Sequence, residues 1–280
     1  MAKTTTRKPP IRRKSTKKKK SLFSAKFVVV AFLLLGLLFG IYHYRNAILY
    51  YFSFKTDKVL KEDKVAQARI YQVLKKHEGK VFGFDVSQFQ GEINWKEIDS
   101  VEGKFPLRFV FIRATAGNDK EDSRFDENWV AAKRHNFIRG AYHYYRPNEN
   151  SIEQAENFIK TVKLKKGDFP PVLDIEKLPK NQSIDSLKVG LKRWLKKIDE
   201  HYKVRPIIYT GEKYYNDFLR EDFPEYTFWV ANYNFFVEEI KDDWLFWQFT
   251  EKARIDGINE RVDINIYNGT PKMLEYLTIN

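Results

Sequence analysis

The sequence contains no cysteine among its 280 residues. Disulfide bonds, thiolate catalysis and cysteine-based metal sites are therefore excluded, while the cellular compartment stays open. Histidine is also scarce, and the five histidines show no H-x-x-x-H spacing, which argues against a zinc site. We expect that the chemistry of this chain uses neither a metal nor a cofactor.

Acidic residues are nearly missing from the first part of the chain. Residues 1–80 hold 20 Lys/Arg against 4 Asp/Glu, a net charge of +16. Residues 81–280 hold the remaining 30 Lys/Arg against 33 Asp/Glu, a net charge of −3. The basicity therefore belongs to the N-terminal arm, and we expect no nucleic-acid partner for the larger, slightly acidic part.

One apolar run stands next to that basic arm. Residues 27–44, "FVVVAFLLLGLLFGIYHY", carry no Asp, Glu, Lys or Arg. As a helix they would span about 27 Å, close to the thickness of a bilayer's hydrocarbon core. A cleaved signal peptide would have a shorter apolar region and a small-residue cleavage site, which "GIYHYRNAILYY" does not offer. We favour an uncleaved single-pass anchor that binds the lipid bilayer.

The positive-inside rule gives this anchor an orientation. Residues 1–26 are predicted to be a basic, disordered cytoplasmic tail, and the chain after Arg45 is predicted to be periplasmic or extracellular at the cell membrane. Residues 45–80 include an amphipathic pattern over 56–77, which predicts a helix that serves as a stalk or packs on the following domain. Its lysine-rich face leaves a role at the membrane surface open.

Residues 81–280 show a different pattern, in which short apolar strands alternate with amphipathic helices. The predicted helices are 124–136, 151–164 and 183–202, the last two with Ser151 and Ser183 as N-caps. The predicted strands are 81–87, 108–115, 139–146, 170–176, 205–210, 227–233, 244–250 and 262–267. Such alternation predicts a parallel α/β sheet, and eight strands predict a closed, TIM-like β/α barrel. The last three strands have no room for full helices between them, so we expect irregularity there.

Polar residues gather near the ends of these strands, where the chemistry of such barrels is found. They are Asp85, Arg113, His143, Asp174, Glu176, Tyr209, Asn232 and Gln248. We expect them to line one opening, although each could alone be a satisfied strand-end residue. Aromatic residues of the same strands suit either stacking on sugar rings or filling the core; they are Tyr145, Trp229, Tyr233 and Trp247.

The stretch "FPPVLDIE", residues 169–176, places two acids in an otherwise apolar strand. Burying a carboxylate without a partner is costly, and residues i and i+2 of a strand face the same side. Asp174 and Glu176 therefore face a common space, unless the strand has already ended and both are simply solvated. Crowded carboxyls split their pKa values, which lets one stay protonated while its neighbour is ionised.

Seven motifs in order resemble glycoside hydrolase family 25, the muramidases often called Chalaropsis-type lysozymes. They are "GFDVSQFQGEINW", "FIRATAG", "GAYHYYRP", "PPVLDIE", "PIIYT", "FWVANY" and "VDINIY", and they cover about residues 81–270. The resemblance implies a flattened β/α barrel that cuts the β-1,4 bond between N-acetylmuramic acid and N-acetylglucosamine in peptidoglycan. It also implies four catalytic acids, with Glu176 as the proton donor beside Asp174, Asp85 and Asp263.

One position departs from the family's pattern. Many members have "KATEG" or "KASEG" in the second strand where this chain has "RATAG", so that Ala116 replaces an acid and Arg113 replaces a lysine. This departure bears on substrate contacts and not on the catalytic acids. Contacts with the substrate are expected from six residues: Arg113, Tyr145, Tyr209, Asn232, Trp247 and Gln248.

The leading hypothesis is therefore a membrane-anchored peptidoglycan hydrolase. The i, i+2 spacing fits retaining geometry, with carboxyls about 5–5.5 Å apart, better than the wider inverting geometry, and it also suits assistance by the substrate's 2-acetamido group, which we favour because the substrate sugars carry that group. A catalytically silent tether that binds peptidoglycan is the alternative, and a cell-wall assembly scaffold recruited through the basic tail is a third. Retention of all four acids favours the enzyme, because a binder needs no general acid. The sequence leaves the oligomeric state open.

Overall fold

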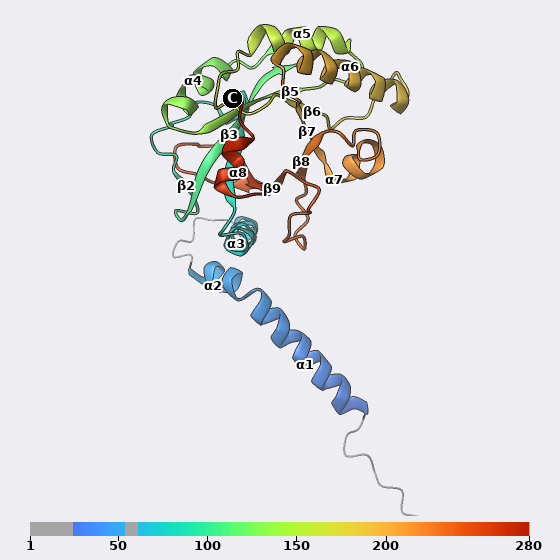
Figure 1. The fold of residues 1–280 in the computed structure, drawn as a ribbon. Coiled ribbons are helices and arrows are strands. Elements are labelled where there is room, and N and C mark those ends of the chain that lie inside the picture. The colour runs from blue at the N-terminus through green and yellow to red at the C-terminus, as the bar shows by residue number, and fades with distance from the viewer. Residues whose placement is uncertain (1–24, 54–60, 280) are drawn as a thin grey trace, which may run out of the picture. The chain divides into compact units, whose positions relative to one another are not determined.

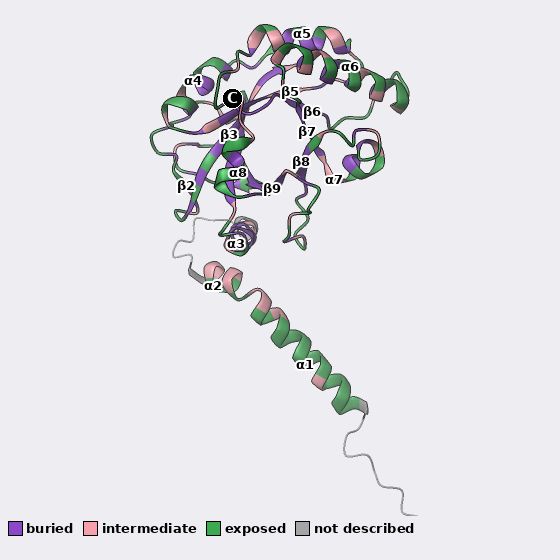
Figure 2. Cartoon of the chain, viewed as in Figure 1, coloured by how far each residue is buried: buried purple, intermediate pink, exposed green. Residues whose placement is uncertain are grey.

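The computed structural model describes residues 25–53 and 61–279, so most of the expected basic tail, residues 1–24, lies outside the described residues. The chain divides into two units, residues 1–45 and 46–280. In the first unit, helix α1 (Ala25–His43) includes an 18-residue segment, 26–43, with a mean hydropathy of 2.1. This helix is long and apolar enough to cross a membrane, and most of its surface is exposed (Figure 2).

The second unit is an eight-stranded closed barrel with helices around it (Figure 1). Its strands are β1 (Val81–Val86), β3 (Phe105–Ala116), β5 (Ile138–Tyr144), β6 (Val172–Asp174), β7 (Ile207–Gly211), β8 (Thr227–Ala231), β9 (Phe246–Ala253) and β10 (Val262–Tyr267). They pair in the order β1-β10-β9-β8-β7-β6-β5-β3, and a parallel pairing of β1 with β3 closes the ring. All eight predicted strands exist, and the predicted irregular barrel is confirmed.

The long helices lie between the first strands, as the periodicity predicts. They are α4 (Phe125–Arg134), α5 (Ser151–Thr161) and α6 (Ile184–Tyr202), and Figure 1 shows α5 and α6 side by side. Ser183 caps α6 as predicted, but α5 is capped by Asn150, whose side chain accepts from the amides of Ile152 and Glu153. The shorter elements are a 3₁₀ turn (Gln88–Gln90), β2 (Ser100–Val101), β4 (Lys120–Glu121), α7 (Glu212–Tyr214), a π-helical turn (Tyr215–Leu219) and α8 (Pro271–Tyr276).

The expectation of an all-parallel sheet is wrong for the last strand. β10 runs antiparallel to both of its neighbours, β9 and β1. Only residues 254–261 connect β9 to β10. A parallel connection needs a crossover of a dozen or more residues, so this short link can only make a hairpin.

Helix α3 (Lys61–Lys76) packs on the barrel at β9, on the side where the chain has no helix between strands (Figure 1). Its residues Ile70, Val73 and Leu74 are fully buried in the same core as the strands. Arg69 donates from Nη1 to the backbone oxygen of Phe249 in β9 at 2.8 Å. The described part of the predicted 56–77 helix therefore packs on the domain, and α2 (Arg45–Ser53) precedes it.

Side-chain alternation along the strands makes two apolar layers. One layer fills the barrel and includes Phe109, Phe111 and Trp229, with the rings of Phe111 and Trp229 stacked at 4.5 Å. The other layer lies between the strands and the helices and includes Val110 and Ile112. Successive residues of a strand face opposite sides. The place of a residue in this alternation, here called its parity, therefore decides whether its side chain faces the interior or the helices.

Candidate active site

Four acids meet in one cavity at the end of the barrel. Asp85 of β1, Asp174 at the end of β6, Glu176 just beyond it and Asp263 of β10 line a cavity of about 210 Å³. The i, i+2 relation of Asp174 and Glu176 turns both to this cavity, while Ile175 between them is buried in the outer layer. The four acids, expected from three different strands, are thus brought together.

Asp85 and Asp263 form a facing pair on neighbouring strands. They are directly opposite each other across the antiparallel β1–β10 ladder, where facing residues have Cβ atoms about 4.5–5.5 Å apart. Burial, the charge of Asp85 and a hydrogen bond to Asp85 raise the pKa of Asp263 to about 10. Burial raises the pKa of Asp85 to about 6, against the hydrogen bonds that it accepts. These effects favour a pair that shares one proton.

Two amides hold the carboxylate of Asp85 in place. Gln248 Nε2 and Asn265 Nδ2 each donate to Asp85 Oδ2 at 2.8 Å. Trp229 Nε1 donates to Asn265 Oδ1 at 2.8 Å, which fixes the amide's orientation. Asn265 was not among the residues expected from the sequence. The signal that could have found it is parity, because Asn265 is two residues after Asp263 on the same strand.

Asp174 is the least compensated of the four acids. Its side chain is buried, and no described residue makes a hydrogen bond to its Oδ1. Burial raises its pKa well above the usual range, and the charges of Glu176 and Asp85 raise it further. Arg113 opposes these effects because a nearby cation favours the carboxylate. Asp174 thus has an acceptor oxygen available and turned to the cavity.

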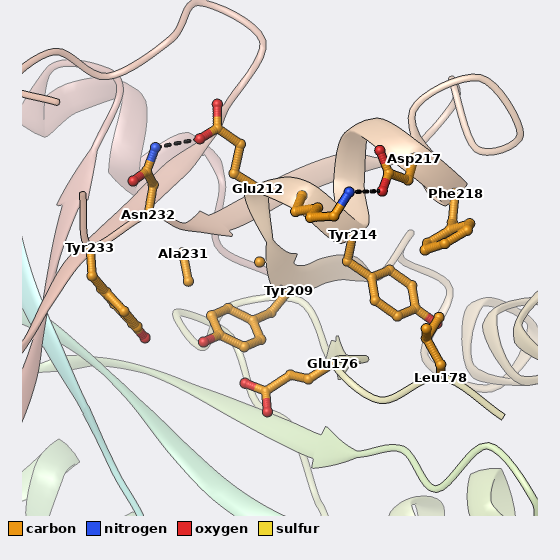
Figure 3. Close-up of a pocket in the computed structure, with 12 residues that line it drawn as sticks. Glu176, Leu178, Tyr209, Glu212, Tyr214, Asp217, Phe218, Ala231, Asn232 and Tyr233 are labelled. Atoms are coloured by element: carbon orange, nitrogen blue, oxygen red, sulfur yellow. Dashed lines mark hydrogen bonds and ion pairs between the residues drawn. The ribbon is translucent and has the colours of Figure 1, made fainter. Parts of the chain in front are cut away.

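Glu176 lies at the open end of the cavity, and its side chain is exposed. Figure 3 shows its carboxyl and the hydroxyls of Tyr209 and Tyr233 turned toward the same space. Partial removal from water raises the pKa of Glu176, while a hydrogen bond from Tyr209 and the charge of Lys177 lower it. Solvent screens Glu176 more than Asp174, so the two carboxyls differ in environment although they share a strand face.

A longer cleft opens on both sides of the acids. On one side a cavity of about 790 Å³ begins at Glu176 and Tyr209 and is lined further by Tyr214, Phe218 and Asn232 (Figure 3). Asn232 donates from Nδ2 to Glu212 in its wall. On the other side a cavity of about 570 Å³ begins at Lys177 and contains Arg113, whose Nε donates to Asp122 Oδ2 at 2.8 Å. Such a cleft can hold an extended ligand across the acids.

Three residues expected at the opening are elsewhere. Tyr145 packs in the outer layer with its hydroxyl bonded to Ser151, and His143 is fully buried between Thr115 and Gln154. Trp247 is also fully buried in that layer, and its Nε1 donates to the backbone oxygen of Asn232 at 3.0 Å. The physical reason is parity: Trp247 and Gln248 are adjacent in β9 and face opposite sides, as do Tyr144 and Tyr145.

Tyr209 and Gln248 do reach the cavity, where the Tyr209 hydroxyl donates to Gln248 Oε1 at 2.7 Å. Within residues 25–53 and 61–279, no group of three or more His, Cys, Asp or Glu side chains is arranged to hold a metal ion. Buried carboxyls with raised pKa values in a long cleft, at the end of a β/α barrel, define a glycoside hydrolase, because such enzymes work with paired acids in different protonation states.

Comparison with known proteins gives the family. The family model described as "Glycosyl hydrolases family 25" matches residues 84–258, and the chain belongs to this family. The "Uncharacterized protein YegX" of Escherichia coli strain K12 is 37% identical over 70% of this chain and 72% of its own length. "Lysozyme M1" of Streptomyces globisporus is 32% identical over 71% of this chain and 72% of its own length.

A solved structure agrees with this assignment. The structure of a family 25 glycosyl hydrolase from Bacillus anthracis superposes with a TM-score of 0.65 at 26% identity, over 72% of this chain and 95% of that chain. The residues that it leaves uncovered exceed a quarter of this chain, which is in keeping with an additional segment outside the barrel. The resemblance inferred from the seven motifs is confirmed.

Proposed function

We propose that this protein is a peptidoglycan hydrolase that cuts the β-1,4 bond between N-acetylmuramic acid and N-acetylglucosamine. The observation that carries the proposal is the meeting of Asp85, Asp174, Glu176 and Asp263 in one cavity within a long cleft. Membership of family 25 and the likeness to "Lysozyme M1" support the substrate class. A silent tether would have no use for buried acids with raised pKa values.

The roles of the acids follow from their surroundings. Glu176, raised in pKa and open to the cleft, donates its proton to the glycosidic oxygen. Asp174, whose carboxylate form is favoured by Arg113 against the burial that raises its pKa, stabilises the positive charge that develops on the sugar ring. The Oδ1 atom of Asp174 can instead hold the substrate's 2-acetamido group while the acetamido oxygen attacks the anomeric carbon. Asp85 and Asp263 lie in the same cavity and influence the charge states of Asp174 and Glu176.

The purified domain, residues 46–280, tests the activity directly. We expect it to release muropeptides from peptidoglycan, and mass spectrometry should find N-acetylmuramic acid at their reducing ends. N-acetylglucosamine at the reducing ends would show cleavage of the other glycosidic bond. Binding without any released fragment would support the tether instead.

We also propose that helix α1 anchors the protein in the cell membrane, with the basic tail in the cytoplasm and the barrel outside. Its 18-residue hydrophobic segment and the basic residues before it support this orientation. Alkaline phosphatase fused after residue 280 should be active, and the protein should stay in the membrane fraction after a wash with alkaline carbonate. A mature protein that begins near residue 46 would contradict the anchor.

A further inference from the structure

The two arms of the cleft differ in charge. The cavity that begins at Lys177, here called the Lys177 pocket, has a volume of about 570 Å³ and is lined by Gln88, Phe89, Arg113, Ala116, Lys120, Glu121, Asp122, Tyr144, Arg146 and Lys177. Four of these side chains are cationic and two are acidic. The opposite cavity, of about 790 Å³, holds Glu176, Glu212 and Asp217 against Lys213, which is paired with Asp217 at 2.5 Å. An anionic ligand group therefore favours the Lys177 pocket.

Three of the four cations of the Lys177 pocket already pair with carboxylates: Arg113 with Asp122, Lys120 with Asp119, and Arg146 with Asp119 and Glu149. Asp122 is buried and already accepts hydrogen bonds from Arg113 Nε and from the backbone amide of Gln88, at 2.8 and 2.9 Å. Glu121 points to Lys160 of α5, with 3.4 Å between Oε1 and Nζ. Of the cations, Lys177 has no carboxylate of the described residues within ion-pair distance. Its Nζ lies 5.4 Å from the centre of the Tyr144 ring.

Arg113 adds a second donor set to this pocket. Its guanidinium lies over the ring of Phe89, with 4.7 Å from Cζ to the ring centre, and its Nε is held by Asp122. No described residue accepts a hydrogen bond from its two terminal nitrogens. A guanidinium fixed by stacking and by one ion pair can present those nitrogens as a planar fork, which fits a carboxylate.

Ala116 adds no charge to the wall of the Lys177 pocket. The sequence has an alanine in "RATAG", and the structure places Ala116 in the wall of the Lys177 pocket. An acid at this position would put a carboxylate among the four cations. With alanine the pocket keeps both its volume and its excess of cationic side chains.

We propose that the Lys177 pocket binds a carboxylate of the peptide stem that hangs from the muramic acid residue beside the cleavage point. This inference rests on the proposed function, because it concerns the same substrate. The sugar rings of the glycan carry no free acid when the lactyl group is joined to the peptide, so the free carboxylates of the substrate are in its stems. Lys177 directly follows Glu176 in sequence, which places the pocket beside the scissile bond.

The experiment compares two substrates and three variants. One substrate is a soluble glycan oligomer with intact stems, and the other is the same oligomer with its stem carboxyls converted to methylamides. The variants are Lys177→Gln, Arg146→Gln and Ala116→Glu, with Lys196→Gln as the control. Lys196 lies on α6 outside every wall of the cleft, and 77% of its side chain is exposed.

On the intact substrate we expect each variant to lose about three- to fivefold in kcat/KM through KM, the usual range for an exposed ion pair. The kcat/KM of the wild type should fall by a similar factor from the intact to the amidated substrate. On the amidated substrate the variants should differ little from the wild type. Lys196→Gln should behave as the wild type does. Equal losses on both substrates, or a wild type indifferent to amidation, would overturn the subsite. A wild type that cuts neither oligomer would instead overturn the proposed function.

Discussion

Replacing Glu176 with glutamine is expected to lower kcat by at least about a hundredfold, the usual worth of general acid catalysis. Glutamine has nearly the same shape and keeps the contact with Tyr209, but it cannot release a proton to the leaving oxygen. Because Glu176 is at the open end of the cavity, the change should leave folding and glycan binding almost intact. Steady-state rates and binding of a non-cleaved oligomer measure the two effects separately.

Glu212→Gln is the matched control for this experiment. Glu212 lines the same large cavity, where it accepts from Asn232 and pairs with Lys241, but it is not among the four clustered acids. Its replacement should change kcat by only a few-fold. If Glu176→Gln turns over as fast as the wild type, or if Glu212→Gln shows the large loss, Glu176 is not the proton donor.

The fold could largely be predicted from the sequence because most of its strands and helices have a clear period. The direction of β10 could not, because strand periodicity is the same for parallel and antiparallel neighbours. The length of the link before it, residues 254–261, was the usable signal, since a parallel crossover needs more residues. The position of α3 depends on tertiary packing. Its apolar face predicts that the helix is buried on one side, but the sequence does not indicate that it packs on β9.

For the site, residue type was a weaker guide than parity. Asp174 and Glu176 were singled out because they are two residues apart, which is a geometric argument, whereas Asp263 was expected only from the resemblance to family 25. Trp247 was chosen for its chemistry, although it is next to Gln248 and cannot face the same side of β9. Counting in steps of two from Asp263 would have predicted Asn265, the amide that holds Asp85.

Asp174→Asn is expected to have the second large effect, a loss of about a hundredfold in rate, comparable to the removal of one charge-stabilising group from an active site. The amide cannot carry the negative charge that stabilises the developing positive sugar ring. It also cannot assist the 2-acetamido group in its attack as a carboxylate does. The buried position of Asp174 makes the charge effective, because little water screens it.

The same substitution should also change the pH dependence of the rate. In the wild type, burial and mutual repulsion among the acids keep a proton on the Asp174–Glu176 pair to higher pH than either carboxyl would hold alone. The alkaline limb of the kcat/KM profile reports the loss of that proton from the free enzyme. In the Asp174→Asn variant the remaining Glu176 ionises without a charged neighbour on its strand, so its pKa falls and the limb moves to lower pH.

Asp263→Asn separates this effect from a general disturbance of the site. Burial and the charge of Asp85 raise the pKa of Asp263 to about 10 and so favour its neutral form, and an asparagine amide can replace its hydrogen bond to Asp85. The substitution therefore leaves the charge near Glu176 almost unchanged, and the alkaline limb should move less than with Asp174→Asn. Profiles measured from about pH 4 to about pH 9, the span in which perturbed carboxyls titrate, compare the two variants. A limb that stays in place for Asp174→Asn and shifts for Asp263→Asn would show that the proton controlling catalysis is shared across β1 and β10, and not along the strand that carries "LDIE".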